Sequence, residues 1–167
     1  MSFSVFLAGF SLGISLILAI GAQNAFVLKQ GLKQQHVFVV CLICALSDAI
    51  LITLGVAGFG VVVQKYPFIE QLARYLGAAF LFFYSALSFK SALTTDHALQ
   101  AQGKEVGSLI AATLTCLAFT WLNPHVYLDT IILLGSISTQ YEGQQVAFGL
   151  GAIFGSFVFF FSLGYGA

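Results

Sequence analysis

Charged residues are scarce in this sequence. They make up 7% of its 167 residues, whereas 59% are hydrophobic, and the mean hydropathy is +0.99. A soluble domain of this length needs more charged surface than that. From Met1 to Leu28 there is no charged side chain at all, and roughly 20 apolar residues are enough to cross a bilayer core. We therefore expect an integral membrane protein that crosses the bilayer several times.

Other features that the sequence lacks exclude some classes of function. The net charge is zero, so no basic stripe points to nucleic acid as a partner. The segment Gly58-Phe59-Gly60 is followed by valines rather than by Lys and Ser or Thr. It is therefore no Walker-type phosphate loop, and we expect no direct use of ATP. The N-terminus lacks the basic region of a cleaved signal peptide, so the first apolar segment is expected to remain as a membrane helix.

The three cysteines, Cys41, Cys44 and Cys116, all fall in apolar stretches. Cys41 and Cys44 form a CxxC, but no second pair of ligands accompanies it, as a structural zinc site would require. A thiol in apolar surroundings behaves as a small hydrophobic side chain. We expect no metal, no cofactor and no enzymatic activity.

Hydropathy predicts an all-α bundle of membrane-spanning helices that forms a single membrane domain over residues 1–167. The apolar stretches are five, at residues 3–28, 37–63, 72–89, 108–134 and 146–167. Short polar connectors separate them.

The longest connector, residues 90–107, divides the chain into a first three-helix repeat (1–89) and a second repeat (108–167). A plan of three plus three inverted repeats with broken helices would explain this position. Because the second repeat shows two apolar stretches, we expect a sixth span to be missing from it. Within the spans, Gly9 with Gly13 and Gly151 with Gly155 have the spacing that lets membrane helices pack closely.

Asp48 lies about twelve residues into the second apolar stretch, roughly 18 Å deep at about 1.5 Å per residue. This is near the bilayer midplane, where a carboxyl group is most costly and usually marks a functional site. No lysine or arginine in this stretch can neutralise it. The structural alternative is a protonated aspartic acid that hydrogen-bonds a neighbouring helix.

Asn123-Pro124 breaks the fourth apolar stretch. Proline cannot donate to the carbonyl of Thr120, and it biases Asn123 away from helical angles. Asn123 is then predicted to be an N-cap and Pro124 the first residue of a new half-helix, whose free amides face the bundle. Such helix starts bind anions, including a substrate carboxylate. A kink that serves packing alone is the alternative.

Asp129 follows Pro124 by five residues, about one and a half helical turns. If both face inward, the carboxylate and the start of the half-helix are neighbours. The alternative is an aspartate at the membrane interface, where a straight helix would carry it. The histidines His125 and His97 are assigned no role, because a lone histidine is usually hydrogen-bonded locally.

Gly21-Ala22-Gln23-Asn24 interrupts the first apolar stretch with small and polar residues. Two amides at membrane depth need partners, so we predict a second broken helix. The segment 23–28 also matches the segment 123–128, since an amide opens both and a leucine closes both. Breaks at corresponding positions of two halves indicate a transporter binding site.

Two segments resemble the signature segments of the LysE-type basic amino-acid exporters. They are Gly21-Ala22-Gln23-Asn24-Ala25-Phe26 and Asn123-Pro124-His125-Val126-Tyr127-Leu128-Asp129-Thr130. The resemblance covers essentially the whole chain, including the intramembrane Asp48. In related exporters of neutral amino acids, a Pro-Gly-Pro segment typically replaces Gln23-Asn24, and an apolar residue is common near the Asp129 position.

This resemblance implies an exporter of arginine or lysine in the bacterial inner membrane, in a family whose members have six spans. The residues agree, because two membrane carboxylates without an embedded cation suit a cationic ligand. The expected substrate-binding residues are Asp48, Asp129, Asn123, Pro124, Gln23 and Asn24, and proton exchange at either aspartate would give antiport.

Two other functions stay open at this stage. Carboxylate and amide oxygens also coordinate inorganic cations, and the aspartates of an inactive membrane fragment would bind partner helices. The expected partners are a basic amino acid and the lipid bilayer, without nucleic acid. The sequence leaves open whether copies of the chain form a homo-oligomer.

Overall fold

The computed structural model describes residues 2–18, 21–59 and 108–167, together with scattered positions between 65 and 90. Every regular element in this part of the chain is helical, which confirms the all-α class. Apart from those scattered positions, the predicted third span (72–89) and the connector (90–107) lie outside the described residues.

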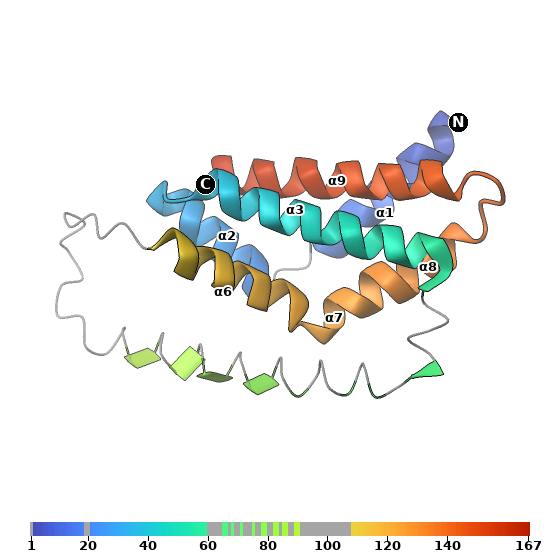
Figure 1. Ribbon diagram of the computed structural model, residues 1–167. Coiled ribbons are helices and arrows are strands. Elements are labelled where there is room, and N and C mark those ends of the chain that lie inside the picture. Colours follow the sequence, from blue (N-terminus) through green and yellow to red (C-terminus); the bar gives the residue numbers. More distant parts are fainter. Residues whose placement is uncertain are drawn as a thin grey trace.

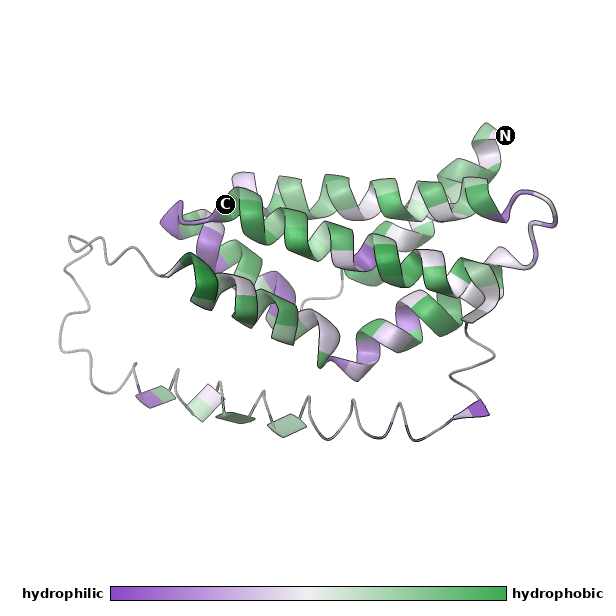
Figure 2. Ribbon diagram, in the orientation of Figure 1, coloured by the Kyte–Doolittle hydropathy of each residue, from purple (hydrophilic) through white to green (hydrophobic). Residues whose placement is uncertain are grey.

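The helices form one bundle in which α3 and α9 run side by side, with α1 against α9 (Figure 1). In chain order they are α1 (Phe3–Ile17), α2 (Ala22–Lys33), α3 (Val37–Leu54), the π-helix η1 (Gly55–Phe59), α6 (Leu109–Trp121), α7 (Pro124–Tyr127), the π-helix η2 (Leu128–Leu134), α8 (Gly135–Ser138) and α9 (Gln145–Tyr165). Figure 2 shows mostly apolar residues along α1, α3, α6 and α9, with polar colour on α2, at the connections and around the break between α6 and α7.

Two of these helices are long and apolar enough to cross a membrane by themselves. They are residues Val37–Gly58 and Gln145–Tyr165, of 22 and 21 residues. Two bent pairs of helices pass the same test of length and hydropathy when each pair is counted as one span. The pair α1 and α2 turns by 86° across residues 18–21, of which 19 and 20 are not described, and the pair from α6 to α8 turns by 57°. The described residues thus contain between two and four spans, which coincide with four of the five predicted stretches.

The first predicted stretch ended too early. The hydropathy pattern placed the end of this apolar stretch at Leu28, whereas helix α2 continues to Lys33. Hydropathy falls at Lys29, but a helix ends where its backbone is capped. Here Gln34 adopts the left-handed conformation with φ 52° and donates its backbone N–H to Gln30 and Gly31.

Glycines let α1 and α9 approach until their backbones touch. A Cβ on Gly9 would strike the carbonyl of Phe148, and one on Gly151 would strike the carbonyl of Phe6. The predicted close packing through glycine pairs is therefore confirmed, with each pair facing backbone of the other helix.

A second glycine contact joins the two halves of the chain. Gly55, at the start of η1, lies against the backbone of Thr130 and Ile131 in η2, and Gly135 lies against Gly55 itself. Side chains at these glycines would separate the helices, so the crossing depends on their absence. It holds the half-helix beyond Pro124 close to the end of α3.

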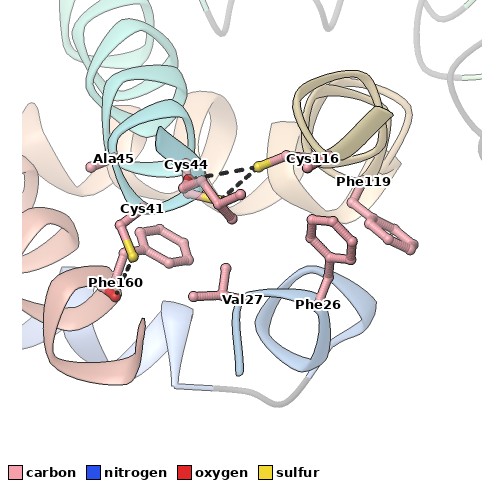
Figure 3. Close-up of a cluster of buried hydrophobic side chains, with 10 residues drawn as sticks. Phe26, Val27, Cys41, Cys44, Ala45, Cys116, Phe119 and Phe160 are labelled. Carbon is pink, nitrogen blue, oxygen red and sulfur yellow. Dashed lines mark hydrogen bonds between the residues drawn. The ribbon is translucent and has the colours of Figure 1, made fainter. Parts of the chain in front are cut away.

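The cysteines belong to a buried cluster between α2, α3, α6 and α9 (Figure 3). The Cys44 sulfur lies 3.2 Å from the sulfur of Cys116, and the Cys41 thiol donates to the carbonyl oxygen of Phe160 at 3.2 Å. All three are free thiols, and the two members of the CxxC point to different partners. The described residues contain no cluster of ligands that could hold a metal ion.

The α1–α9 contact predicts how α9 tolerates alanine. Gly151→Ala should lower stability by about 1–3 kcal/mol, because backbone cannot make room for the methyl group. The melting temperature in detergent should then fall by roughly 3–10 °C. Gly149→Ala, on the same helix, is the matched control, since the atoms nearest to its Cβ would belong to the Val56 side chain, at 3.3 Å, and not to backbone. Equal melting temperatures for the two variants would contradict the close packing.

Candidate functional site

A cavity of about 260 Å³ lies where the two broken helices meet α3. Its walls combine apolar side chains with a few polar groups, which is the usual composition of a small-molecule site. The polar and charged residues that line it are Gln23, Asn24, Asp48, Asn123, His125, Asp129 and Thr130. Five of the six residues predicted to bind substrate are in this set. We call this space the central cavity.

Asp48 lies in the middle of α3 with 4% of its surface exposed. The hydroxyl of Ser156, on α9, donates a hydrogen bond to its Oδ2 atom at 2.8 Å. This bond is the contact with a neighbouring helix that the structural alternative required. Asp48 nevertheless also lines the central cavity, so the carboxyl group is both supported by protein and next to a ligand-sized space.

The break at Asn123-Pro124 lies where it was predicted, but its first amides are not free: Val126 donates its N–H to the carbonyl oxygen of Asn123 at 3.2 Å, and the N–H of His125 is bonded as well. Asn123 is the N-cap with extended backbone, its Oδ1 accepts the N–H of His125 at 3.1 Å, and Pro124 is the first residue of α7. From there the helix runs without a break through η2 and α8 to Ser138. Pro124 does not line the central cavity. It contributes by starting the half-helix there, whereas Asn123 lies on the cavity wall.

Asp129 lies five residues beyond Pro124, in the first turn of η2, with 24% of its side chain exposed. It lines the same cavity as Asp48. Its Oδ2 lies 3.7 Å from Nε2 of His125, four residues earlier. Asp129 therefore faces the interior of the bundle and not simply the membrane interface.

The first broken helix is also present. Gly21 is the extended N-cap of α2, and Gln23 and Asn24 lie in the first turn. The side-chain amide of Asn24 donates a hydrogen bond to the carbonyl oxygen of Ile17 at 2.7 Å. This bond satisfies one of the backbone groups that the break leaves without a helical partner. The Gln23 Nε2 atom is buried without a hydrogen-bond partner among the described residues.

The charged groups that line the central cavity determine which kind of ligand it suits. Two carboxylates line the cavity, together with residues at the starts of α2 and of the half-helix at Pro124, and a helix start carries the positive end of the helix dipole. No lysine or arginine is among its lining residues in the described part of the chain. The cavity can thus accept a molecule that carries an excess of positive charge and one anionic group.

Sequence reasoning missed three features of this site. Ser156 was overlooked, although it is polar and lies at the centre of an otherwise apolar stretch. The π-helices η1 and η2 left no recognisable sequence signal. His125 was left without a role, yet it lines the cavity. His97, the other histidine considered, lies outside the described residues.

Residues 14–167 match the model of a protein family described as LysE type translocator. The chain belongs to the LysE family. This membership makes it a translocator of the membrane, in agreement with the apolar helices. It also confirms the resemblance drawn from the two broken-helix segments.

Curated relatives of this LysE-family protein are similar along nearly its whole length. Arginine exporter protein ArgO of Escherichia coli (strain K12) is 39% identical over 162 residues, which cover 96% of this chain and 77% of the relative. Arginine exporter protein ArgO of Pectobacterium carotovorum subsp. carotovorum (strain PC1) is 40% identical over 162 residues, covering 96% of this chain and 79% of the relative. No solved structure gives a significant match.

The Ser156–Asp48 bond predicts a stability difference between two serines of α9. Ser156→Ala should lower the stability of this LysE-family protein by about 1–3 kcal/mol, because the buried carboxyl group loses its donor. Ser162→Ala, at an exposed position of the same helix, should stay within about 0.5 kcal/mol of wild type. Thermal unfolding in detergent at neutral pH measures both. A Ser156→Ala variant as stable as Ser162→Ala would mean that the bond contributes nothing.

Proposed function

We propose that this LysE-family protein exports a basic amino acid, arginine or lysine, across the bacterial inner membrane. The observation that carries the proposal is the pairing of Asp48 and Asp129 on one cavity that no lysine or arginine lines among the described residues. A pair of carboxylates in a low-dielectric site favours a cationic ligand over a neutral one. The relatives named arginine exporter support the same substrate class.

The substrate's two ends find different partners in this proposal. Its guanidinium or ammonium group binds the carboxylates of Asp48 and Asp129. Its α-carboxylate binds at the positive dipole ends of the two half-helices, where Asn123 and Pro124 lie on one side and Gln23 and Asn24 on the other. Helix starts bind anions in this way, and transporters commonly use broken helices for this purpose.

The two breaks also support the proposed repeat. Gln23 and Asn123 begin matching segments, and both breaks line one cavity. This is the arrangement expected where residues 1–89 and 108–167 derive from one repeated unit, with the binding site at the repeat interface. Alternating access would then move one half against the other around the central cavity.

Proton antiport is the proposed coupling. A carboxyl group in the bundle can hold either a proton or the substrate's cation, and exchange between the two couples their movement in opposite directions. Asp48, with 4% of its surface exposed, is the better placed of the two, because a bare charge at its depth is the more costly. A trapped pH dye that shows no proton movement during arginine efflux would contradict this coupling.

Carboxylate neutralisation tests the proposed binding site. In proteoliposomes loaded with labelled arginine, Asp48→Asn and Asp129→Asn should each reduce efflux at least tenfold, because an amide keeps the shape but loses the charge that pairs with the substrate. Glu142→Gln removes a carboxylate from the exposed turn before α9 and is the matched control. It should keep nearly full efflux.

Undiminished efflux from both aspartate variants would overturn the proposal. The same vesicles distinguish the alternative of an inorganic cation as substrate. If divalent ions inhibit the flux by competition and unlabelled arginine does not, the substrate is an inorganic cation. Unlabelled lysine and arginine, compared as competitors, report which amino acid is preferred.

A second test concerns the α-carboxylate. Agmatine, which is arginine without its carboxylate, keeps the guanidinium group but has nothing to place at the helix starts. It should compete with arginine efflux at least tenfold more weakly than unlabelled arginine does, since a charged hydrogen-bonded contact contributes about 1.5–3 kcal/mol. Equal competition by both compounds would show that the half-helix starts do not bind the substrate's α-carboxylate.

A further inference from the structure

We propose that Trp121 is a positioning residue of the central cavity: its indole N–H, bonded to Ser47, sets where the carboxyl group of Asp48 lies relative to that of Asp129. The inference rests on the proposed function, because it concerns how the two carboxylates share one cation. Trp121 does not line the central cavity, so it acts on the substrate only through the residues that it holds in place.

The side chain of Trp121 joins the end of α6 to the middle of α3. Trp121 is the last residue of α6, and its Nε1 donates a hydrogen bond to Oγ of Ser47 at 3.2 Å, across 74 residues of chain. Ser47 is buried and directly precedes Asp48. Because successive residues of a helix point about 100° apart, a contact that holds Ser47 also fixes the direction in which Asp48 points.

Asp48 is therefore held from two sides. Ser156 of α9 donates to its carboxylate directly, at 2.8 Å, whereas Trp121 of α6 holds the residue next to it. The bond from Ser156 restrains the carboxyl group against α9. The bond from Trp121 restrains the rotation of α3 relative to the broken span that carries Asp129.

The backbone of Trp121 is bonded to the half-helix that carries Asp129. In an unbroken helix, its carbonyl oxygen would accept the N–H of the residue four positions later, His125. The break redirects that N–H to Oδ1 of Asn123, and the hydroxyl of Tyr127 donates to the Trp121 carbonyl oxygen at 2.6 Å. Tyr127 is the last residue of α7, two residues before Asp129. This bond crosses the 57° bend between the two parts of the span.

Apolar packing strengthens the same connection. Leu51 lies three residues beyond Asp48 on α3, and Ile131 lies two residues beyond Asp129 on η2. The two side chains are buried in one cluster. The partly buried side chains packed against them are Trp121, Val126, Tyr127 and Ile132. The elements that carry the two carboxylates therefore meet at a core that includes Trp121.

Two carboxylates bind one cation together only if both reach it. A binding group must be held within about 0.5 Å of its productive position, and the attraction between opposite charges falls as their distance grows. Trp121 is connected to both carboxylate-bearing elements, to α3 by its side chain and to the half-helix by its backbone. Loss of the indole N–H should thus weaken substrate binding without removing any group that touches the substrate.

Trp121→Phe removes the indole N–H and keeps an aromatic side chain. In arginine–arginine exchange across proteoliposomes, its half-saturating arginine concentration should rise roughly three- to tenfold, the effect of losing one neutral hydrogen bond. The maximal exchange rate should stay within about twofold of wild type, as expected when only binding is weakened.

Ser47→Ala removes the acceptor of the same bond and should raise the half-saturating concentration by a similar factor. The double variant Trp121→Phe/Ser47→Ala should bind arginine no more weakly than either single variant, because both substitutions delete one contact. Melting temperatures in detergent show whether each variant is folded. If Trp121→Phe does not fold, Ser47→Ala tests the bond by itself.

Ser138→Ala is the matched control. Ser138 is buried like Ser47, but its hydroxyl donates to the carbonyl oxygen of Gly135 within its own helix, at 2.6 Å. This variant loses a buried hydrogen bond, so its melting temperature should fall, whereas its half-saturating concentration should match wild type. The two serine variants thus separate an effect on position from an effect on stability.

Wild-type half-saturating concentrations in both Trp121→Phe and Ser47→Ala would overturn the inference. Additive effects in the double variant, or an equal rise in Ser138→Ala, would overturn it as well. Failure of the proposed function looks different, because the wild-type protein itself would then not exchange arginine.

Discussion

A carboxyl group in the middle of an apolar helix must have a partner, and the hydrogen bond from Ser156 to Asp48 provides it. An unpartnered group at this depth would cost several kcal/mol. The bond joins α9 to α3, while the glycine contacts at Gly9 and Gly151 join α9 to α1. Helix α9 is therefore the element against which the carboxylate helix and the first broken helix are both positioned.

The hydrogen bond from Ser156 leaves other acceptor sites on the Asp48 carboxylate unused. A carboxylate offers about four lone-pair sites on its two oxygens, and one hydroxyl donor uses a single site. A structural role and a binding role are therefore compatible at this residue. The arrangement lowers the cost of keeping the group in the bundle without removing its capacity to bind a cation in the central cavity.

The breaks in the helices follow from an equally strict constraint. Backbone groups inside a membrane must be hydrogen-bonded, so a helix can be interrupted there only where protein or a cavity receives the freed groups. The Asn24 amide satisfies the carbonyl of Ile17, and the Asn123 side chain satisfies the amide of His125. Gln23, Asn24 and Asn123, which stand at the two breaks, all line the central cavity. Both interruptions therefore open onto one space while these backbone groups stay hydrogen-bonded.

The sequence by itself determined what depends on single segments: the all-helical membrane class, the two breaks, the N-cap role of Asn123, the depth of Asp48 and the glycine spacing. These features depend on residues that are close together in the chain, so the order of residues is enough to predict them. The third span and the connector were predicted too, but they lie outside the described residues. Tertiary structure alone decided that Ser156 meets Asp48, that Cys44 meets Cys116 and not Cys41, and that Asp129 and His125 share the cavity with Asp48. The first two contacts join helices that are more than 70 residues apart in the chain. The third depends on the direction in which the half-helix runs. Only the packing of the helices determines either one.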